Sequence, residues 1–180
     1  GSQLVKQRNI FFGLILFTCG LFAGGTQASF SNVECTNVAH LATLTVPQTE
    51  CEALEALWDS TDGVNWSDNS GWDTLTSVNT WNGITAPGGT VLMVSQYANN
   101  LSGTIPPELG NLNGLWSLSL EDNQLTGSIP PELGDLNGLW SLSLEDNQLA
   151  GSIPPELGNL NNITNLSLQD NQLTGSIPPG

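Results

Sequence analysis

The chain has 180 residues, of which 17 are Asp or Glu, two are Lys or Arg and one is His, so its formal net charge is −15. Its Lys and Arg residues are Lys6 and Arg8, and no fixed positive charge follows them. Binding to nucleic-acid phosphates depends on Lys and Arg, and a P-loop or a Schiff base requires Lys. The composition therefore excludes these functions, and the length allows about one domain.

Residues 1–28 have the pattern of a secretory signal peptide. A basic start (KQR) precedes the mostly apolar residues 10–23, and TQA offers a small-x-small cleavage site after Ala28. The apolar run is shorter than the roughly 20 residues that a membrane-spanning helix needs. We expect a secreted or cell-surface protein. A retained anchor and a lipidated Cys19 are the alternatives, so a membrane enters only through this signal or a segment outside the sequence.

Cleavage of the signal would leave two cysteines, Cys35 and Cys51. Exported proteins meet an oxidising compartment, so we expect these two to form a disulfide. The loop that it closes would contribute about 3 kcal/mol on the chain-entropy model. Two buried free thiols are the alternative. His40 adds too few ligands for a metal site, and we expect it to be a structural or surface residue. No cofactor is expected.

The segment from residue 48 to residue 84 predicts a helix followed by a tryptophan-rich stretch. CEALEALW at residues 51–58 has apolar residues at helical spacing, and Pro47 and Asp62-Gly63 bracket a helix of about 48–60. The whole segment contains four tryptophans, which we expect to form a local core: Trp58, Trp66, Trp72 and Trp81. A platform that stacks on sugars is the alternative.

The second half of the chain repeats itself with a period of 24 residues. Three full copies span residues 91–114, 115–138 and 139–162, and a truncated fourth copy spans 163–180. We expect the apolar end of this last copy to be exposed. A repeat of this length marks a solenoid, in which no copy can bury its apolar stripe alone and stacked copies share one core.

One copy shows how the chain should fold locally. Leu115, Leu118 and Leu120 are predicted to face inward from a short strand, and the amide of Asn123 to bond the backbone at the following turn. Gly127 permits a tight bend. Pro130 and Pro131 then stop the ladder and start a short helical turn that Gly134 ends, after which Leu136 fills the far side of the core.

The pattern LxxLxLxxNxLxGxIPxxLGxL resembles the consensus of the plant-type leucine-rich repeat, found in receptor-kinase ectodomains and polygalacturonase-inhibiting proteins. This resemblance implies an α/β repeat solenoid: a right-handed horseshoe fragment with a parallel β-sheet on its concave face and a second row of short strands. The helix and the segment ending in WNGI resemble the family's N-terminal cap. The expected domains are a signal peptide at 1–28, a cap at 29–90 and repeats at 91–180.

Two positions depart from the family pattern. The cap of the family usually has cysteines around its WxGI motif, and this chain has none there. Gln96 stands where the first copy should have its third strand leucine, so we expect imperfect packing where the cap meets the array.

The solvent-facing positions of the predicted sheet form rows, because equal positions of neighbouring strands lie about 4.8 Å apart. The candidate ligand contacts in these rows are Trp116, Trp140, Tyr97, Ser119, Ser143, Glu121, Glu145, Asp122, Asp146 and Asp170. Adjacent exposed tryptophans favour a recognition face, since aromatic residues dominate binding hot spots. The alternative is that recent duplication simply repeated whatever residue was there.

Five of these candidates are carboxylates that repel one another across the sheet, and no Lys or Arg follows residue 8 to offset them. The compensation must come from salt, from a weakly bound cation such as calcium, or from a basic partner. A high-salt habitat would explain the acidity without any specific ligand.

The residues predict a binding protein. Ser, Asp and Glu without a placed His or Lys form no activated nucleophile, so we expect no enzyme. We expect a recognition scaffold that binds an extracellular protein, peptide or glycan through its concave face. The alternatives are an ectodomain fragment of a larger receptor or adhesin, an ice-binding solenoid that uses the Ser and Thr row from Ser102 to Ser176, and a glycan-active enzyme with paired carboxylates.

Overall fold

The computed structural model describes residues 46–72 and 77–177. The predicted signal peptide, Cys35 and His40 lie outside these residues. The described ranges belong to one compact unit, Ser31–Gly180. Within the described ranges, no helix combines the length and apolar character that a membrane span requires.

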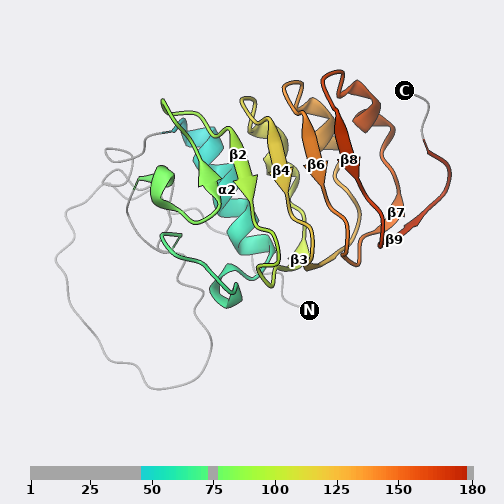
Figure 1. Cartoon of the computed structure of the whole chain (residues 1–180), viewed down its shortest axis with the longest axis horizontal. Coiled ribbons are helices and arrows are strands. Elements are labelled where there is room, and N and C mark those ends of the chain that lie inside the picture. Colours follow the sequence, from blue (N-terminus) through green and yellow to red (C-terminus); the bar gives the residue numbers. More distant parts are fainter. Residues whose placement is uncertain (1–45, 73–76, 178–180) are drawn as a thin grey trace, which may run out of the picture. The chain divides into compact units, whose positions relative to one another are not determined.

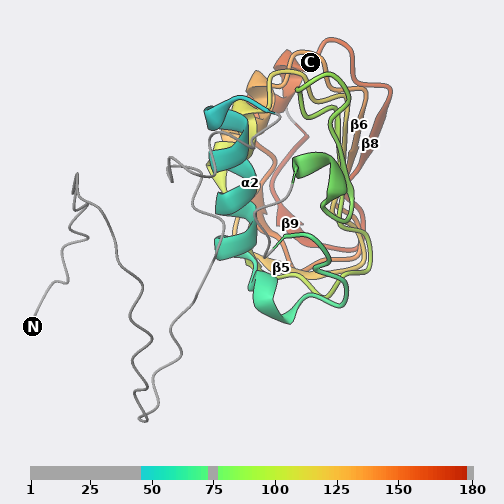
Figure 2. The ribbon, with the colours of Figure 1, turned by 90° about the vertical axis from the view of Figure 1, so that its left-hand side faces the viewer.

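The predicted helix is confirmed as α2, Gln48–Ser60. It starts directly after Pro47, and the hydroxyl of Thr61 closes its end by donating to the carbonyl oxygen of Leu57 at 2.6 Å. Its apolar face, which includes Leu54 and Leu57, is fully buried. In Figure 2 this helix stands at the start of the row of short helices that the repeats form.

The strands of the repeats form one continuous sheet, called here the inner sheet (Figure 1). Its strands, in spatial order, are β1 (Ile84–Thr85), β2 (Met93–Ser95), β4 (Ser117–Ser119), β6 (Ser141–Ser143) and β8 (Asn165–Ser167). The pairs from β2 to β8 are parallel and shift by one repeat, so that Leu118 pairs with Leu142 and Leu142 with Leu166. The antiparallel strand β1 was not expected, and it lets the cap pair with the edge of the array.

A second row of strands and a row of 3-10 helices complete each repeat. The second-row strands are β3 (Ser102–Thr104), β5 (Gln124–Thr126), β7 (Ala150–Ser152) and β9 (Gln172–Thr174). Two parallel pairs, β3 with β5 and β7 with β9, form in this row. The repeat helices are η3 (Pro107–Asn111), η4 (Pro131–Asp135) and η5 (Pro155–Asn159), and the cap adds η1 (Gly63–Asn65) and η2 (Val78–Thr80). These layers confirm the implied α/β repeat solenoid.

The leucines of the repeat build a single core, as the pattern predicted. The second copy buries its whole apolar stripe, with exposed fractions of 1% or less at Leu115, Leu118, Leu120, Leu125, Ile129, Leu133 and Leu136. Burying one leucine side chain contributes about 2 kcal/mol. The stacked copies therefore supply most of the stabilisation, while no single copy could fold alone.

A ladder of asparagines ties each copy to the one before it. Asn147 accepts a hydrogen bond from the backbone N–H of Leu125 at 2.9 Å, and its amide donates to the carbonyl oxygens of Leu120 and Leu144 at 2.9 and 3.2 Å. Asn123 and Asn171 make matching bonds in their copies. A buried backbone group without a partner costs roughly 1–3 kcal/mol, so this amide is needed at every turn.

The tryptophans of the cap form a packed cluster. Ring centroids lie 4.8 Å apart between Trp66 and Trp72 and 5.1 Å apart between Trp72 and Trp81, and Trp58 packs against the first two rings. The indole N–H of Trp72 donates to the carbonyl oxygen of Asn82 at 2.8 Å. All four side chains are buried, so they are the core of the cap and cannot form a sugar-stacking platform.

Gln96 does not leave the packing defect that its sequence position predicted. It is 1% exposed, and its amide donates to the carbonyl oxygen of Asn82 at 2.8 Å while its own oxygen accepts from the Asn99 amide at 2.6 Å. Asn99 also donates to the carbonyl oxygen of Asp68. The glutamine replaces apolar contact with a hydrogen-bonded link between the cap and the first repeat.

Cys51 is buried on α2 and is disulfide-bonded. Its partner lies outside the described residues. The pairing of Cys51 with Cys35 therefore stays a prediction.

The repeat helices pack so closely that their backbones leave no room for a side chain at the contact, which therefore requires glycine. A Cβ atom at Gly134 would lie 2.3 Å from the carbonyl oxygen of Glu156 in the next helix. We expect Gly134→Ala to reduce the free energy of unfolding by about 1–3 kcal/mol, measured by urea denaturation. The matched control is Gly138→Ala, whose Cβ would lie 3.5 Å from its nearest neighbour, the carbonyl oxygen of Leu115. Equal losses in both variants would contradict the close-contact argument.

A buried carboxylate in the cap gives a second prediction. Glu50 is 6% exposed and accepts a hydrogen bond from the backbone N–H of Val91 at 2.7 Å. Burial raises the pKa of Glu50, and the bond from Val91 only partly opposes this. Because the folded state has the higher pKa, the protonated carboxyl favours folding at low pH, and this contribution is lost as the pH rises through the folded-state pKa.

The variant Glu50→Gln keeps an acceptor oxygen for Val91 without the charge. We expect it to raise the Tm at pH 7, and we expect the gain to shrink as the pH falls below the ordinary pKa of Glu. The control is Glu52→Gln on the same helix. It removes the same charge, but the hydrogen bond that Glu52 accepts from the Gln48 amide is exposed. A gain that is as large in the control, or that does not vary with pH, would disprove the proposed role of burial.

Candidate functional site

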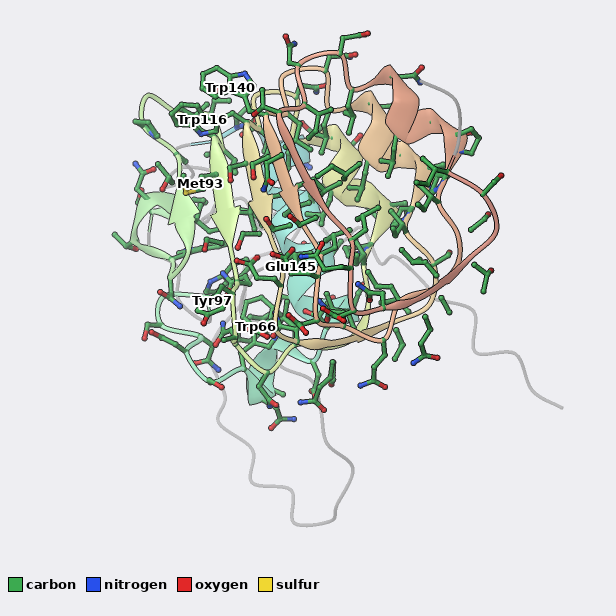
Figure 3. All side chains as sticks on the ribbon, turned by 45° about the vertical axis from the view of Figure 1, so that its right-hand side comes forward. Trp66, Met93, Tyr97, Trp116, Trp140 and Glu145 are labelled. Carbon is green, nitrogen blue, oxygen red and sulfur yellow. The ribbon has the colours of Figure 1, made fainter. Side chains whose placement is uncertain are left out.

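The candidate site is the solvent-facing side of strands β2, β4, β6 and β8 with the residues that flank them, called here the inner face. In Figure 3 its side chains divide by position along the strands. Trp116 and Trp140 lie at the end where the strands begin, and Tyr97 and Glu145 lie towards the end where they finish. The structure thus gathers the predicted residues on one face but separates the aromatic pair from the acids.

Trp116 and Trp140 form an exposed aromatic pair. Their ring centroids are 5.3 Å apart, with an angle of 65° between the planes, which is an edge-to-face contact. Such contacts add about 0.5–1.5 kcal/mol beyond the burial of area, so each ring fixes the orientation of the other. The side chains are still 37% and 54% exposed, respectively. The pair is therefore an ordered apolar surface that remains open to solvent.

Backbone hydrogen bonds place the two rings side by side. The N–H of Trp116 donates to the carbonyl oxygen of Leu92 at 2.9 Å, and the N–H of Trp140 donates to that of Trp116 at 2.8 Å. Thr164 continues the ladder by donating to the carbonyl oxygen of Trp140 at 2.8 Å. Because the register is fixed before each strand begins, equal positions of the repeats lie directly next to one another.

Half-buried serines occupy the middle of the inner face. Ser119 and Ser143 are paired across β4 and β6, and Ser143 is paired with Ser167 of β8. Their hydroxyl groups can donate and accept, so the centre of the face is polar without being charged.

The acidic residues follow the strands and differ in their surroundings. Glu121 and Glu145 are half-buried, and Glu121 accepts a hydrogen bond from the hydroxyl of Ser119 at 2.5 Å. In contrast, the buried carboxylate oxygen Oε2 of Glu145 has no hydrogen-bond partner among the described residues. A buried polar atom without a partner is costly, and this distinguishes Glu145 from Glu121.

The aspartates of the acidic row have a structural role that the sequence alone did not reveal. Asp122, Asp146 and Asp170 have φ values of 56°, 53° and 55° and are exposed. Among residues other than Gly, Asp and Asn adopt this left-handed conformation most readily. The turn after each strand therefore explains these aspartates, and Glu121 and Glu145 are the carboxylates that the turn does not explain.

The inner face carries carboxylates, hydroxyl groups and aromatic rings. Within the described ranges, no group of three or more His, Cys, Asp and Glu side chains is arranged to hold a metal ion. The carboxylates of the inner face are surrounded by serine side chains and backbone groups, and no Lys or Arg follows residue 8.

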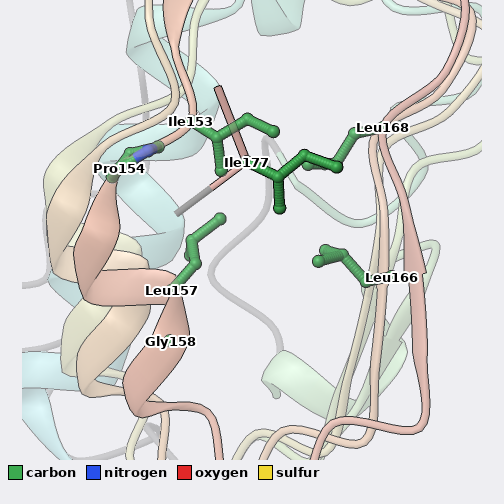
Figure 4. A pocket seen from close by; sticks show the side chains of 7 residues that line it. All are labelled: Ile153, Pro154, Leu157, Gly158, Leu166, Leu168 and Ile177. Atoms are coloured by element: carbon green, nitrogen blue, oxygen red, sulfur yellow. The ribbon is translucent and has the colours of Figure 1, made fainter. Parts of the chain in front are cut away.

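An apolar cavity of about 310 Å³ lies in the last repeat, where the sequence predicts an exposed apolar end (Figure 4). It is lined by Ile153, Pro154, Leu157, Gly158, Leu166, Leu168 and Ile177. Leu166 and Ile177 are 46% and 85% exposed, whereas Leu142, one repeat earlier in the register of Leu166, is fully buried. Leu166 pairs with Leu142 in the register of the sheet, so the leucine period itself predicts an apolar side chain at this place.

Comparison with known proteins agrees with the repeat pattern. The family model described as Leucine Rich Repeat matches residues 114–136, 138–160 and 162–180. Comparison with curated protein sequences gives no significant match.

Several solved structures share the fold. The crystal structure of PEPR1–AtPEP1 is similar with a TM-score of 0.61 and 30% identity, over 71% of this chain and 18% of that chain. The leucine-rich-repeat ectodomain of the plant membrane receptor kinase GASSHO1/SCHENGEN3 from Arabidopsis thaliana, in complex with Casparian strip integrity factor 2, is similar with a TM-score of 0.52 and 34% identity, over 73% of this chain and 19% of that chain.

A plant ice-binding protein is also similar, with a TM-score of 0.52 and 25% identity over 74% of this chain and 52% of that chain. The chain therefore spans about a fifth of the first two structures and about half of the third. The repeats, their asparagine ladder and these likenesses together show that the chain is a leucine-rich-repeat protein of the plant type.

Proposed function

We propose that the chain is an extracellular, non-catalytic recognition scaffold whose inner face binds a protein or peptide. The observation that carries this proposal is the exposed pair Trp116–Trp140, held in register by the backbone ladder and followed by serine and glutamate rows. An aromatic pair beside polar groups is the usual composition of a binding hot spot.

The rigidity of the pair supports recognition over a by-product of duplication. A ring that is ordered before binding loses little side-chain entropy when a partner covers it, and that entropy costs about 0.5–1.5 kcal/mol per side chain otherwise. Trp116 and Trp140 are fixed by their mutual contact and by adjacent strands. Covering them also removes apolar surface from water, which favours association.

The structural likenesses support the extracellular part of the proposal. One similar structure is a receptor-kinase ectodomain that is bound to Casparian strip integrity factor 2. This chain covers a small share of that ectodomain, so the partner of that protein does not transfer. What supports the proposal is the shared scaffold together with the residues that this chain displays on it. A glycan that stacks on the tryptophans would use the same surface.

The direct test selects peptides from a random displayed library against the full chain and then measures their affinity for variants. We expect Trp116→Ala combined with Trp140→Ala to weaken binding at least about 30-fold, because losing a hot-spot residue costs about 2 kcal/mol or more. Val64→Ala is the control, since Val64 is 53% exposed and belongs to η1 of the cap, not to the strands of the inner face. Undiminished affinity in a double variant that keeps its circular dichroism and its Tm would refute the proposal.

Ice binding is a second candidate, favoured by the likeness to a plant ice-binding protein. The second strand row presents regularly spaced hydroxyl side chains to solvent, and Thr104 pairs with Thr126 while Ser152 pairs with Thr174. The hydroxyl of Thr126 donates to the carbonyl oxygen of Gly103 at 3.0 Å, which fixes its orientation. An ordered row of small polar groups could match a repeating solid surface.

An assay of ice recrystallisation tests this candidate. If the row binds ice, the full chain should inhibit crystal growth, and Thr126→Tyr should abolish inhibition because the bulky ring holds ice away from the row. Glu132→Tyr, at an exposed position of η4, is the control. No inhibition by the unmodified chain would eliminate this function and leave the binding proposal intact.

A further inference from the structure

The negative charge of the inner face restricts which classes of partner can bind to it. No Lys or Arg follows residue 8, so none of the described residues can neutralise the carboxylates of the face. Like charges on adjacent strands repel one another. A partner with positive charge would remove this repulsion, whereas a nucleic acid or an acidic polymer would increase it.

The two glutamates of the row are the acids that a partner can use. Glu121 accepts a hydrogen bond from Ser119, whereas the buried oxygen Oε2 of Glu145 has no partner among the described residues. The turn conformation that explains the aspartates does not involve either glutamate. Both side chains are only half-buried, so a guanidinium or ammonium group on the face could pair with the accessible part of each carboxylate, and such charge-assisted bonds are about twice as strong as neutral ones.

The distance between Glu145 and the tryptophans indicates how far apart the two contacting side chains of the partner lie. Within one repeat, Glu145 follows Trp140 by five residues, and Figure 3 shows the two at opposite ends of the strands. At a rise of about 3.3 Å per residue, five residues of extended chain span about 16 Å. An extended peptide laid along a strand covers this distance with the same number of residues.

We infer that the partner is a basic, extended protein segment that crosses the inner face along the strands. A cationic side chain pairs with Glu145 and Glu121, and an apolar side chain about five residues away packs on Trp116 and Trp140. The serines between them contact the backbone of the segment. This inference rests on the proposed function. It adds the charge of the partner and the spacing between its cationic and apolar side chains.

The competing explanation for the acids is an inorganic cation. Within the described ranges, no cluster of three or more carboxylates could coordinate one. Half-buried glutamates on the same face as an exposed aromatic pair instead suit a partner that carries both a cationic and an apolar side chain. The test therefore includes calcium chloride as an arm.

The experiment measures the affinity of three synthetic peptides for the full chain by the fluorescence of its tryptophans and by calorimetry. All three have a Gly/Ser framework. The first has an Arg and a Phe about five residues apart, the second has the same residues adjacent, and the third has Glu in place of Arg. We expect the first to bind about tenfold more tightly than the second, the third not to bind, and sodium chloride to weaken the first.

Paired variants then locate the charge. We expect Glu121→Gln with Glu145→Gln to weaken the first peptide about tenfold or more, and Glu145→Gln alone to act more strongly than Glu121→Gln alone. The matched control is Glu132→Gln with Glu156→Gln, which removes the same charge from exposed positions of η4 and η5, outside the inner face. Its affinity should change less than twofold.

Three results would overturn the inference. The first is that the Glu121/Glu145 variant binds the first peptide as tightly as the unmodified chain does. If the tryptophan double variant still loses its library-selected peptides, the proposed function remains supported. The second is an equal loss in both glutamate pairs, which shows unspecific attraction. The third is displacement of the peptide by calcium chloride but not by sodium chloride of equal ionic strength, which assigns the site to a cation. Retained library binding in the tryptophan double variant would instead refute the proposed function.

Discussion

The constraint on which the structure depends is that no repeat can cover its own leucines. Each copy presents an apolar stripe on one side and accepts the stripe of its neighbour on the other. The asparagine at the end of each strand makes this stacking directional, since Asn147 accepts from the preceding copy at Leu125 and donates to it at Leu120. Burial supplies the free energy, and the asparagine ladder prevents neighbouring copies from slipping.

The register of the stacked copies also determines which residues meet in the candidate site. Because copies stack without offset, residues 24 positions apart become neighbours, and two isolated tryptophans in the sequence become one edge-to-face pair. The register also sets carboxylates beside one another, so the candidate site carries an electrostatic cost that a basic partner would relieve. The proposed contact surface and its internal repulsion therefore arise from the same geometry.

The sequence predicted the repeating part well, because a strict period leaves one way to bury the leucines. It also predicted α2, whose apolar spacing and flanking Pro47 are local signals. It failed where contacts join distant segments. The hydrogen bonds that Gln96 makes to the cap, the burial of Glu50 against Val91 and the antiparallel strand β1 depend on how the cap meets the array. In the site, the rows were predictable, but the unpartnered oxygen of Glu145 and the turn conformation of the aspartates required coordinates.

The near-identity of the two central copies has a consequence for how such a surface can change. Since Asn123 and Asn147 make equivalent bonds, removing or adding one whole unit would leave every remaining junction chemically the same. The cap would still meet the same first unit. Recombination between copies could thus lengthen or shorten the display area in whole steps, each step adding or deleting one indole and one pair of acids, without passing through a misfolded intermediate.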